Sequence, residues 1–195
     1  MLSSIHPLGE RSKGNRYGVT ATAHIVGAAL GGALLGVVAG LVALGLGHAL
    51  GPRPREAVLL AVVVVAAALE LAGRRPPSWR RQVNEVWLTT YRGWVYGGGF
   101  GVQLGAALVT IVTSPLTYVM VAAAALVGSF PAAVVVAATF GLARGATILA
   151  SARVRDQDAL VRLHRRLVQL GPPVARVASV AMVACAVALV GVLAA

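Results

Sequence analysis

The sequence predicts an all-α protein, a polytopic bundle of transmembrane helices. The composition is 58% hydrophobic and 12% charged, whereas a soluble domain carries about 25% charged residues. Several apolar runs approach or exceed the ~20 residues that cross a hydrocarbon core. Alanine, glycine and valine dominate these runs, and such small side chains let helices pack closely in a membrane. The length leaves room for one transmembrane domain, 23–195, after a polar cytoplasmic segment, 1–22.

The N-terminal segment, 1–22, carries Arg11, Lys13 and Arg16. We expect no cleavable signal peptide, because the first long apolar run exceeds the length of a signal-peptide core. That run, 23–47, is the first predicted span. Its glycines recur at four-residue spacing, which places small residues along one face for helix packing. They are Gly27, Gly31, Gly32, Gly36 and Gly40.

The second predicted span, 56–73, contains Glu70, the only acidic residue inside an apolar run. We favour an ion pair between Glu70 and Arg74, four residues further on at the membrane edge. The alternative is a proton- or cation-binding role, because a carboxylate within a membrane is a candidate functional group.

Two segments have the pattern of amphipathic helices that lie in the plane of the lipid headgroups. In 74–96, aromatic residues and valines recur at three- and four-residue steps opposite arginines and other polar residues. In 153–170, leucines lie opposite Arg162, Arg165 and Arg166. We expect both helices at the cytoplasmic interface, where arginine contacts anionic headgroups.

The central stretch, 98–128, is longer than one span needs, since its 31 residues would form a helix of about 46 Å. Ser114-Pro115 divides it, and proline removes a backbone donor and displaces the carbonyl one turn earlier. We therefore expect one span broken at 114–115, whose freed backbone groups are satisfied by hydroxyls, water or neighbouring helices. The same hydroxyls could bind a solute. The candidate solute-binding residues are Thr110, Thr113, Ser114, Pro115, Thr117 and Tyr118.

The fourth predicted span, 131–151, contains Arg144 about two turns before its end. A charged residue at that depth usually faces the bundle interior or a cavity. We therefore add Arg144 to the candidate site, as a group that would bind an anionic part of a solute. The last predicted span, 174–195, follows Pro172 and Pro173.

The distribution of basic residues predicts the orientation. Three Lys or Arg lie in the N-terminal segment, five in 74–95 and five in 152–172, against two in the loop 48–56. A single broken span at 98–128 places the first three groups on one side, and loops rich in basic residues are cytoplasmic. We expect about five spans in the inner (plasma) membrane with a cytoplasmic N-terminus, or about six if 98–128 crosses twice.

The net charge of +11 does not indicate nucleic-acid binding in this sequence. The arginines fall at the ends of apolar runs, where membrane orientation and anionic lipid headgroups explain them. Cys185 is the only cysteine, which excludes an intrachain disulfide, a CxxC redox pair and a cysteine-rich metal site. We expect no metal, no cofactor and no nucleic-acid partner.

Part of the sequence resembles the CcdA or DsbD-like family of cytochrome c biogenesis and thiol–disulfide membrane domains, which belong with the LysE-like transporters. The resemblance rests on LGAALVTIVTSPLTYVMVAAAALVG, a glycine-rich helix broken at Ser-Pro, followed by FPAAVVVAATFGLARGATIL. The second run ends in a pattern of Gly141, Leu142 and Gly145. The resemblance implies a broken helix that frames a small solute cavity. It does not imply electron relay, because the redox cysteine after the Ser-Pro is replaced by Leu116.

Three functions are compatible with these features. We favour a small-solute or ion transporter with its site at the broken helix, because broken helices bind substrates in many transporters. The alternative is a non-catalytic subunit, or an assembly or maturation factor, that packs on a membrane-protein partner or a second copy through its glycine faces. A membrane-embedded enzyme is the least favoured, because Glu70 is the only candidate catalytic group in the spans.

Overall fold

The protein is all-helical in the residues that its computed structural model describes, 5–74, 76–77, 86–107 and 112–194. The prediction of an all-α fold is thereby confirmed. In chain order the elements are α1 (Pro7–Ser12), α2 (Tyr17–Ala49), α3 (Pro52–Leu71), α4 (Trp87–Thr90), α5 (Gly93–Gly105), α6 (Leu116–Leu126), α7 (Phe130–Ala146), the 3-10 helix η1 (Thr147–Ser151) and α8 (Gln157–Ala194).

Three helical stretches are long and apolar enough to cross a membrane, namely Tyr17–Gly47, Phe130–Ser151 and Gln157–Ala194. This number is lower than the predicted five or six. The 20 residues of α3 include two arginines and two glutamates, which reduce its hydropathy. The 13 residues of α5 and the 11 of α6 are each shorter than the ~20 that cross a hydrocarbon core.

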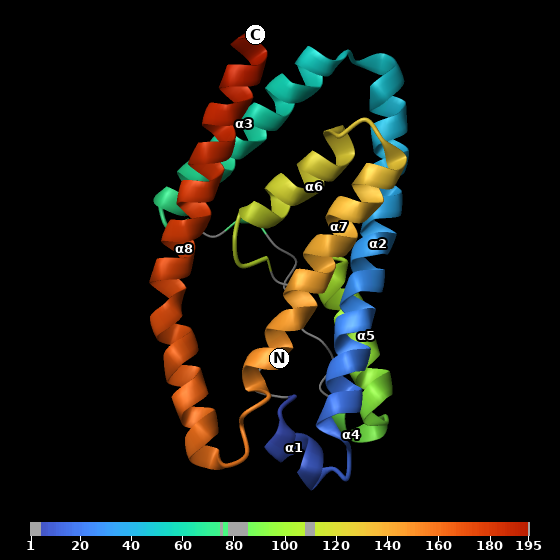
Figure 1. Cartoon of the computed structure of the whole chain (residues 1–195), viewed down its shortest axis with the longest axis vertical. Helices are drawn as coiled ribbons and strands as arrows, with labels where there is room; N and C mark the ends of the chain where they lie inside the picture. The colour runs from blue at the N-terminus through green and yellow to red at the C-terminus, as the bar shows by residue number, and fades with distance from the viewer. Residues whose placement is uncertain (1–4, 75, 78–85, 108–111, 195) are drawn as a thin grey trace.

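Helix α2 is central, and α5 and α7 pack along two adjacent faces of it (Figure 1). A Cβ atom on Gly27 would overlap the carbonyl oxygen of Gly98 in α5, and one on Gly32 would overlap that of Ala137 in α7. The glycines of α2 therefore build two packing faces, one against α5 and one against α7, where the sequence predicted a single face.

The glycines of α5 complete the contact from the other side. A Cβ atom on Gly101 would overlap the carbonyl oxygen of His24, and one on Gly105 would overlap that of Ala28. In α7, Gly141 meets the same Ala28 carbonyl oxygen. These glycine faces are covered within the chain, so a partner protein or a second copy would have to use another surface.

The predicted break at 114–115 has a different form. Helix α5 ends at Gly105, and Ala107 has a left-handed backbone with φ of 55°, a conformation common just beyond a helix end. The Ser114 hydroxyl accepts a hydrogen bond from the Leu116 N–H at 3.2 Å, and Pro115 has helical φ of −56°. A serine cap followed by proline is a favoured helix start. Pro115 therefore opens α6 and does not kink a continuous helix.

Helix α8 also differs from the prediction, because one helix of 38 residues includes Pro172 and Pro173. We expected an interfacial helix, 153–170, and a separate span, 174–195. Asp156 starts α8 by accepting a hydrogen bond from the Ala159 N–H at 2.6 Å. Both prolines are exposed, so the carbonyl groups that lose their helical donors lie at the molecular surface, which lowers the cost of keeping proline inside a helix.

Two predicted elements of the N-terminal half also have different boundaries in the structure. Residues 7–12 form α1, and α2 begins at Tyr17, six residues before the predicted start at 23. Of the predicted interfacial helix 74–96, the structure describes the four-residue α4 and the start of α5. Residues 75 and 78–85 lie outside the described part of the chain.

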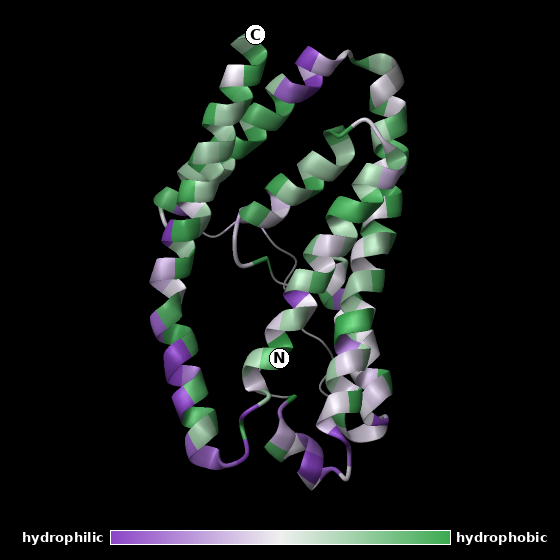
Figure 2. Cartoon of the chain, viewed as in Figure 1, coloured by the Kyte–Doolittle hydropathy of each residue, from purple (hydrophilic) through white to green (hydrophobic). Residues whose placement is uncertain are grey.

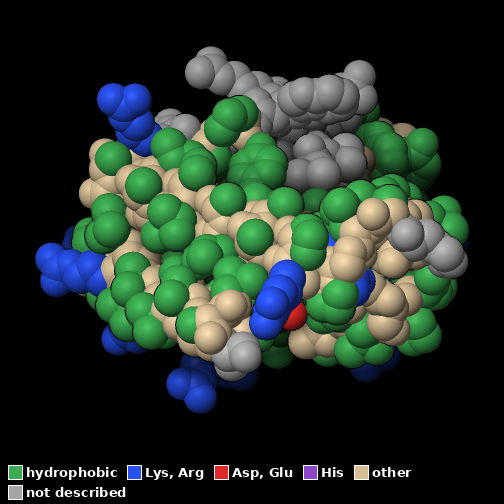
Figure 3. Space-filling model, turned by 90° about the horizontal axis from the view of Figure 1, so that it is seen from above, with side chains coloured by type: hydrophobic (Ala, Val, Ile, Leu, Met, Phe, Trp, Pro, Cys, Tyr) green, Lys and Arg blue, Asp and Glu red, His purple; other side chains and the backbone are tan. Residues whose placement is uncertain are grey.

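The surface has the hydropathy of a membrane protein. Figure 2 shows hydrophobic residues along the helices and hydrophilic residues around α1 and the first half of α8. Seen from above, hydrophobic side chains are spread over the visible face, and several Lys and Arg side chains project at its rim (Figure 3). Large apolar side chains of α2, such as Leu34 and Leu41, are each 61% exposed. Exposed apolar faces of this extent mark a surface made for lipid or for partners.

Candidate functional site

The predicted site residues lie in two places. Residues of the 113–118 segment lie at the start of α6, next to Glu70 at the end of α3. Arg144 of α7 lies at the C-terminal end of α5. Thr110 is outside the residues that the structure describes.

Glu70 contacts Ser114, not Arg74. The Ser114 hydroxyl donates a hydrogen bond to the Glu70 carboxylate at 2.9 Å. Helix α3 ends with a left-handed Gly73, φ of 61°, whose N–H donates to the Glu70 carbonyl oxygen at 3.0 Å. The chain therefore leaves the helix before Arg74. In the described part of the chain, ion pairs join Lys13 to Glu10 and Arg162 to Asp156, so the pair that we favoured for Glu70 is wrong.

The Glu70 carboxylate lies at the N-terminal end of α6. Its partner Ser114 also accepts from the Leu116 N–H, so carboxylate, hydroxyl and backbone form one short chain of hydrogen bonds. A negative charge is stabilised near a helix N-terminus by the exposed N–H groups and the helix dipole. These interactions account for the half-buried Glu70 carboxylate in an apolar region, and no bound ligand is needed to explain it. The described residues contain no group of three or more His, Cys, Asp or Glu that could hold a metal.

The other residues of the 113–118 segment have different surroundings. The Tyr118 hydroxyl donates to the carbonyl oxygen of Pro77, which ties α6 to the chain that follows α3. Thr117 is buried, and Thr113 is exposed. The chemistry available here is one carboxylate and several hydroxyls, a set that suits a small cation or a polar solute.

Arg144 binds the end of a helix. Its Nη1 donates to the carbonyl oxygen of Leu104 at 3.0 Å, and its guanidinium lies 5.6 Å from the centre of the Phe140 ring. Leu104 is in the last turn of α5, and its carbonyl oxygen also accepts from the Ala107 N–H at 3.3 Å, so Arg144 is a second donor at a helix end where regular helical donors run out. A cation there also complements the negative end of the helix dipole. In this structure Arg144 therefore adds a charged hydrogen bond at the C-terminal end of α5.

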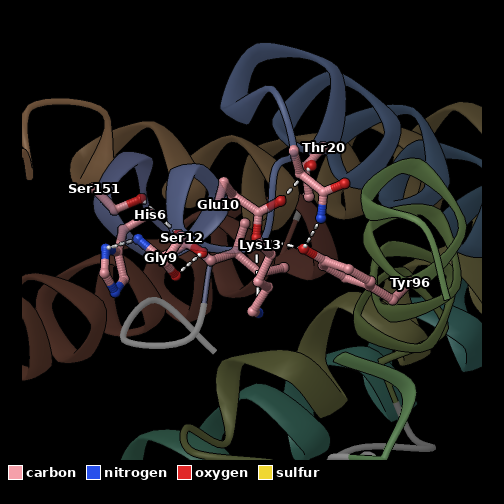
Figure 4. Close-up of polar contacts among 10 residues, drawn as sticks. His6, Gly9, Glu10, Ser12, Lys13, Thr20, Tyr96 and Ser151 are labelled. Atoms are coloured by element: carbon pink, nitrogen blue, oxygen red, sulfur yellow. Dashed lines mark hydrogen bonds and ion pairs between the residues drawn. The ribbon is translucent and has the colours of Figure 1, made fainter. Parts of the chain in front are cut away.

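A second polar cluster, the Glu10 cluster, joins α1, α2 and α5 (Figure 4). Glu10 is fully buried and accepts hydrogen bonds from the Thr20 hydroxyl at 2.7 Å and from the Tyr96 hydroxyl. The Asn15 side-chain amide donates to the Tyr96 oxygen at 3.3 Å, and Lys13 Nζ lies 4.0 Å from the carboxylate. A buried carboxylate costs several kcal/mol unless it is paired and hydrogen-bonded, and here both conditions are met.

Sequence analysis missed this cluster because the segment 1–22 reads as polar and basic. A signal was present, since Glu10 is the only acidic residue before Glu56. Its main partner Tyr96 is 86 residues away, and nothing in the local pattern indicates that contact. The cluster also requires glycine at position 93, because a Cβ atom there would overlap the Thr20 hydroxyl.

His6 and Tyr17 extend the contacts of the N-terminal segment. His6 is buried and its Nδ1 accepts from the Gly9 N–H at 3.1 Å, which caps α1. Burial lowers the pKa of His6, while Glu10 raises it and Lys13 lowers it by smaller amounts. The Tyr17 hydroxyl donates to the Ile148 carbonyl oxygen at 2.8 Å. The start of α2 is thus tied to η1, and the Ser151 hydroxyl of η1 donates to the carbonyl oxygen of Ile5, just before α1, at 3.0 Å.

Comparison with known proteins gives one informative match. The chain is 35% identical over 154 residues to the methylamine utilization protein MauF of Paracoccus versutus. The alignment covers 73% of this chain and 54% of that protein, so the chain spans about half the length of the relative. No model of a protein family matches the chain, and no solved structure matches it.

This finding corrects the resemblance to CcdA or DsbD-like proteins, which is wrong. The match to MauF covers most of the chain, whereas the resemblance rested on two runs of residues that are common in membranes. Its main feature was a helix broken at Ser-Pro. In the structure those two residues directly precede Leu116, the first residue of α6, and the Ser114 hydroxyl accepts from its N–H, a local arrangement found at helix starts in general.

Proposed function

We propose that the chain is a multi-pass protein of the inner (plasma) membrane that acts as an accessory or maturation factor for an enzyme system. The observation that carries this proposal is the 35% identity to MauF across 73% of the chain. The name of that relative places it in methylamine utilization and gives it no reaction. We extend the same physiological setting to this chain.

The polar side chains support an accessory role over transport. Arg144 is bound to the Leu104 carbonyl oxygen, and Glu70 to Ser114. Glu10 has hydroxyl partners in α2 and α5. Each of these charges already has a partner from its own chain, and a solute would have to displace it at the cost of exposing a buried polar group.

The direction of the helices supports about five crossings. Gly27 faces Gly98 and Gly31 faces Val102, so α5 runs parallel to α2. Gly32 faces Ala137 and Gly36 faces Val134, so α7 runs antiparallel to α2. We propose that α5 and α6 together make one crossing, with α2, α3, α7 and α8 as the others and a single transmembrane domain. The N-terminus is cytoplasmic in this proposal, because basic residues gather at that end.

The test is a deletion of the gene in its own host, followed by growth on methylamine and on a nitrogen source that needs no methylamine-consuming enzyme. For an accessory factor, extracts of the deletion strain should lack methylamine-consuming activity although the enzyme polypeptides are synthesised. A plasmid copy of the gene should restore it. Normal growth on methylamine in the deletion strain would contradict the proposal.

The second candidate, transport of a small cation, is favoured by the hydrogen bond between Glu70 and Ser114 where α6 begins. The same deletion strain distinguishes a transporter from an accessory factor. Loss of a transporter would leave the activity of extracts normal and reduce methylamine consumption by intact cells only. The variant Glu70→Gln should then reproduce the deletion in intact cells, whereas an accessory factor should tolerate it apart from reduced stability.

A further inference from the structure

The first part of α8, residues 157–171, stands apart from the rest of the molecule, and we call it the basic arm. None of its residues is buried. The buried residues of α8 are Ser179 and Met182, and Met182 packs with Val63 and Ala66 of α3. In Figure 1 the lower half of α8 runs without a neighbouring helix at its side. The packing of α8 against α3 therefore involves its second half.

The basic arm is strongly amphipathic. At about 100° per residue, Arg162, Arg165 and Arg166 fall together with Asp158 and Gln169 in one sector of roughly 100°. The rest of the circumference is apolar apart from Gln157 and His164. The apolar residues are Ala159, Leu160, Val161, Leu163, Leu167, Val168 and Leu170. Figure 2 shows this half of α8 as a mixture of hydrophilic and hydrophobic residues, while its second half is hydrophobic.

The arginines of the arm have few partners of their own. Arg162 lies 3.8 Å from Asp156, and both side chains are 63% exposed, so this pair contributes little. Arg165 and Arg166 form no ion pair with any residue that the structure describes. The arm thus presents a positive sector and an uncovered apolar sector side by side.

The length of α8 places the arm at the membrane surface. A helix of 38 residues is about 57 Å long, and about 20 residues are enough to cross the hydrocarbon core. The apolar second half supplies those residues. The junction is Gly171-Pro172-Pro173, where the two prolines remove the hydrogen bonds to Val168 and Gln169, so the helix bends there more easily than elsewhere.

We propose that the basic arm binds the anionic lipid headgroups of the leaflet at its own end of α8. The arm bends at 171–173, its leucines enter the headgroup boundary, and its arginines contact lipid phosphates. Positive charge beside a wide apolar face is the chemistry by which surface helices recognise anionic membranes. The proposal does not depend on the function proposed above.

The test uses the full chain in a Cys185→Ala background, reconstituted in vesicles of zwitterionic lipid with or without phosphatidylglycerol. A polarity-sensitive fluorophore is attached at Leu167→Cys on the apolar sector or at Gln169→Cys on the polar sector. We expect the probe at 167 to enter an apolar environment in anionic vesicles only, and the probe at 169 to stay in water. High salt should reverse part of the effect.

A pair of matched variants tests the role of charge. Arg165→Gln with Arg166→Gln should lower the equilibrium constant for docking about 30-fold, from ~1 kcal/mol per arginine near an anionic surface. Arg53→Gln with Arg74→Gln removes two exposed arginines elsewhere and should leave docking unchanged. Each variant must elute as a monodisperse peak.

Three results would overturn the proposal. Equal exposure of both probes in all vesicles would show that the arm does not dock on lipid. Equal protection at 167 in zwitterionic vesicles would show that anionic headgroups are not recognised. Protection that appears in detergent and increases with protein concentration would assign the apolar sector to a second copy of the chain.

Discussion

At the scale of single residues, charged side chains that lie among the helices form hydrogen bonds with polar groups of neighbouring elements. Arg144 meets a carbonyl group at the end of α5, Glu70 meets a hydroxyl at the start of α6, and Glu10 meets two hydroxyls. Polar groups without partners are costly in an apolar environment. A charge inside an apolar sequence can therefore mark a helix end that has to be satisfied as well as a binding site.

Arg144 tests this explanation. Arg144→Met removes the donor to the Leu104 carbonyl oxygen, and we expect the free energy of unfolding to fall by about 2 kcal/mol, the range for hydrogen bonds to charged groups. Arg144→Lys should recover part of the loss, because lysine can still donate to a carbonyl group and complement the helix dipole. Reversible unfolding in mixed detergent micelles measures both.

Arg176→Met is the control for Arg144, because Arg176 is exposed on α8, and we expect no measurable change. If Arg144→Met left stability unchanged and abolished function in cells, the arginine would be a binding residue instead.

His6 gives the protein a pH dependence near its N-terminus. Burial lowers the pKa of His6, so the unfolded state binds more protons than the folded state and stability rises with pH. Neutral His6 makes its full contribution to the free energy of unfolding above pH 6.5, the ordinary pKa of histidine. That contribution is lost as the pH falls toward the lower pKa that His6 has in the folded state. Protonation also removes the lone pair of Nδ1 that accepts from Gly9. Thermal unfolding between pH 8 and 5 should show this loss.

His6→Asn is the matched variant for this measurement. The asparagine side-chain oxygen can cap α1 as Nδ1 does, and asparagine does not titrate in this range. The variant should therefore be less sensitive to acid than the wild type at similar stability near pH 8. An equal loss of stability in both proteins would assign the effect to other groups.

At the scale of elements, the fold depends on how closely α2 approaches its neighbours. The glycines of α2, α5 and α7 let backbone contact backbone, as the overlaps at Gly27, Gly32, Gly101 and Gly105 show. Much of this was predictable, because four-residue spacing of glycine fixes a helix face. The predicted limits of 131–151 also agree closely with α7 and η1, Phe130–Ser151.

Other features could not be predicted, for physical reasons. Serine followed by proline fits either a kink or a helix start, and which one forms depends on whether the preceding residues are held in a helix. Here α5 ends at Gly105, against the Ala28 carbonyl oxygen. Periodicity likewise gives the face of Arg144 and Glu70 but not their partners, Leu104 and Ser114, because those contacts come from tertiary packing.

The glycine face gives a prediction at this scale. Gly101→Ala places a methyl group on the His24 carbonyl oxygen, so α2 and α5 must separate, and we expect destabilisation of about 2 kcal/mol, typical of overpacking. Gly45→Ala is the control, because nothing lies within 4 Å of a Cβ atom there, and alanine in an open helical site should stabilise by about 0.5–1 kcal/mol. Unfolding in mixed micelles should give opposite signs, and equal changes would contradict the packing role.

At the scale of the whole molecule, the distribution of basic residues and the direction of the helices agree. The Leu8 N–H donates to the Val154 carbonyl oxygen at 3.2 Å, so the N-terminal segment and the basic linker before α8 lie at one end. The start of α5 joins them through Tyr96 and Glu10. Arg53 follows the far end of α2. The end with more basic residues should therefore be cytoplasmic.

Cysteine labelling in intact cells tests this orientation in a Cys185→Ala background. Ser12→Cys and Asp158→Cys should resist a membrane-impermeant maleimide until the cells are opened. Arg53→Cys should react from outside, and the loss of that arginine strengthens the charge asymmetry that orients the chain. Ala194→Cys should also react from outside, because α8 ends opposite the N-terminus if α5 and α6 together make one crossing, as we propose. Reaction of Asp158→Cys from outside would mean that α5 and α6 do not form a single crossing.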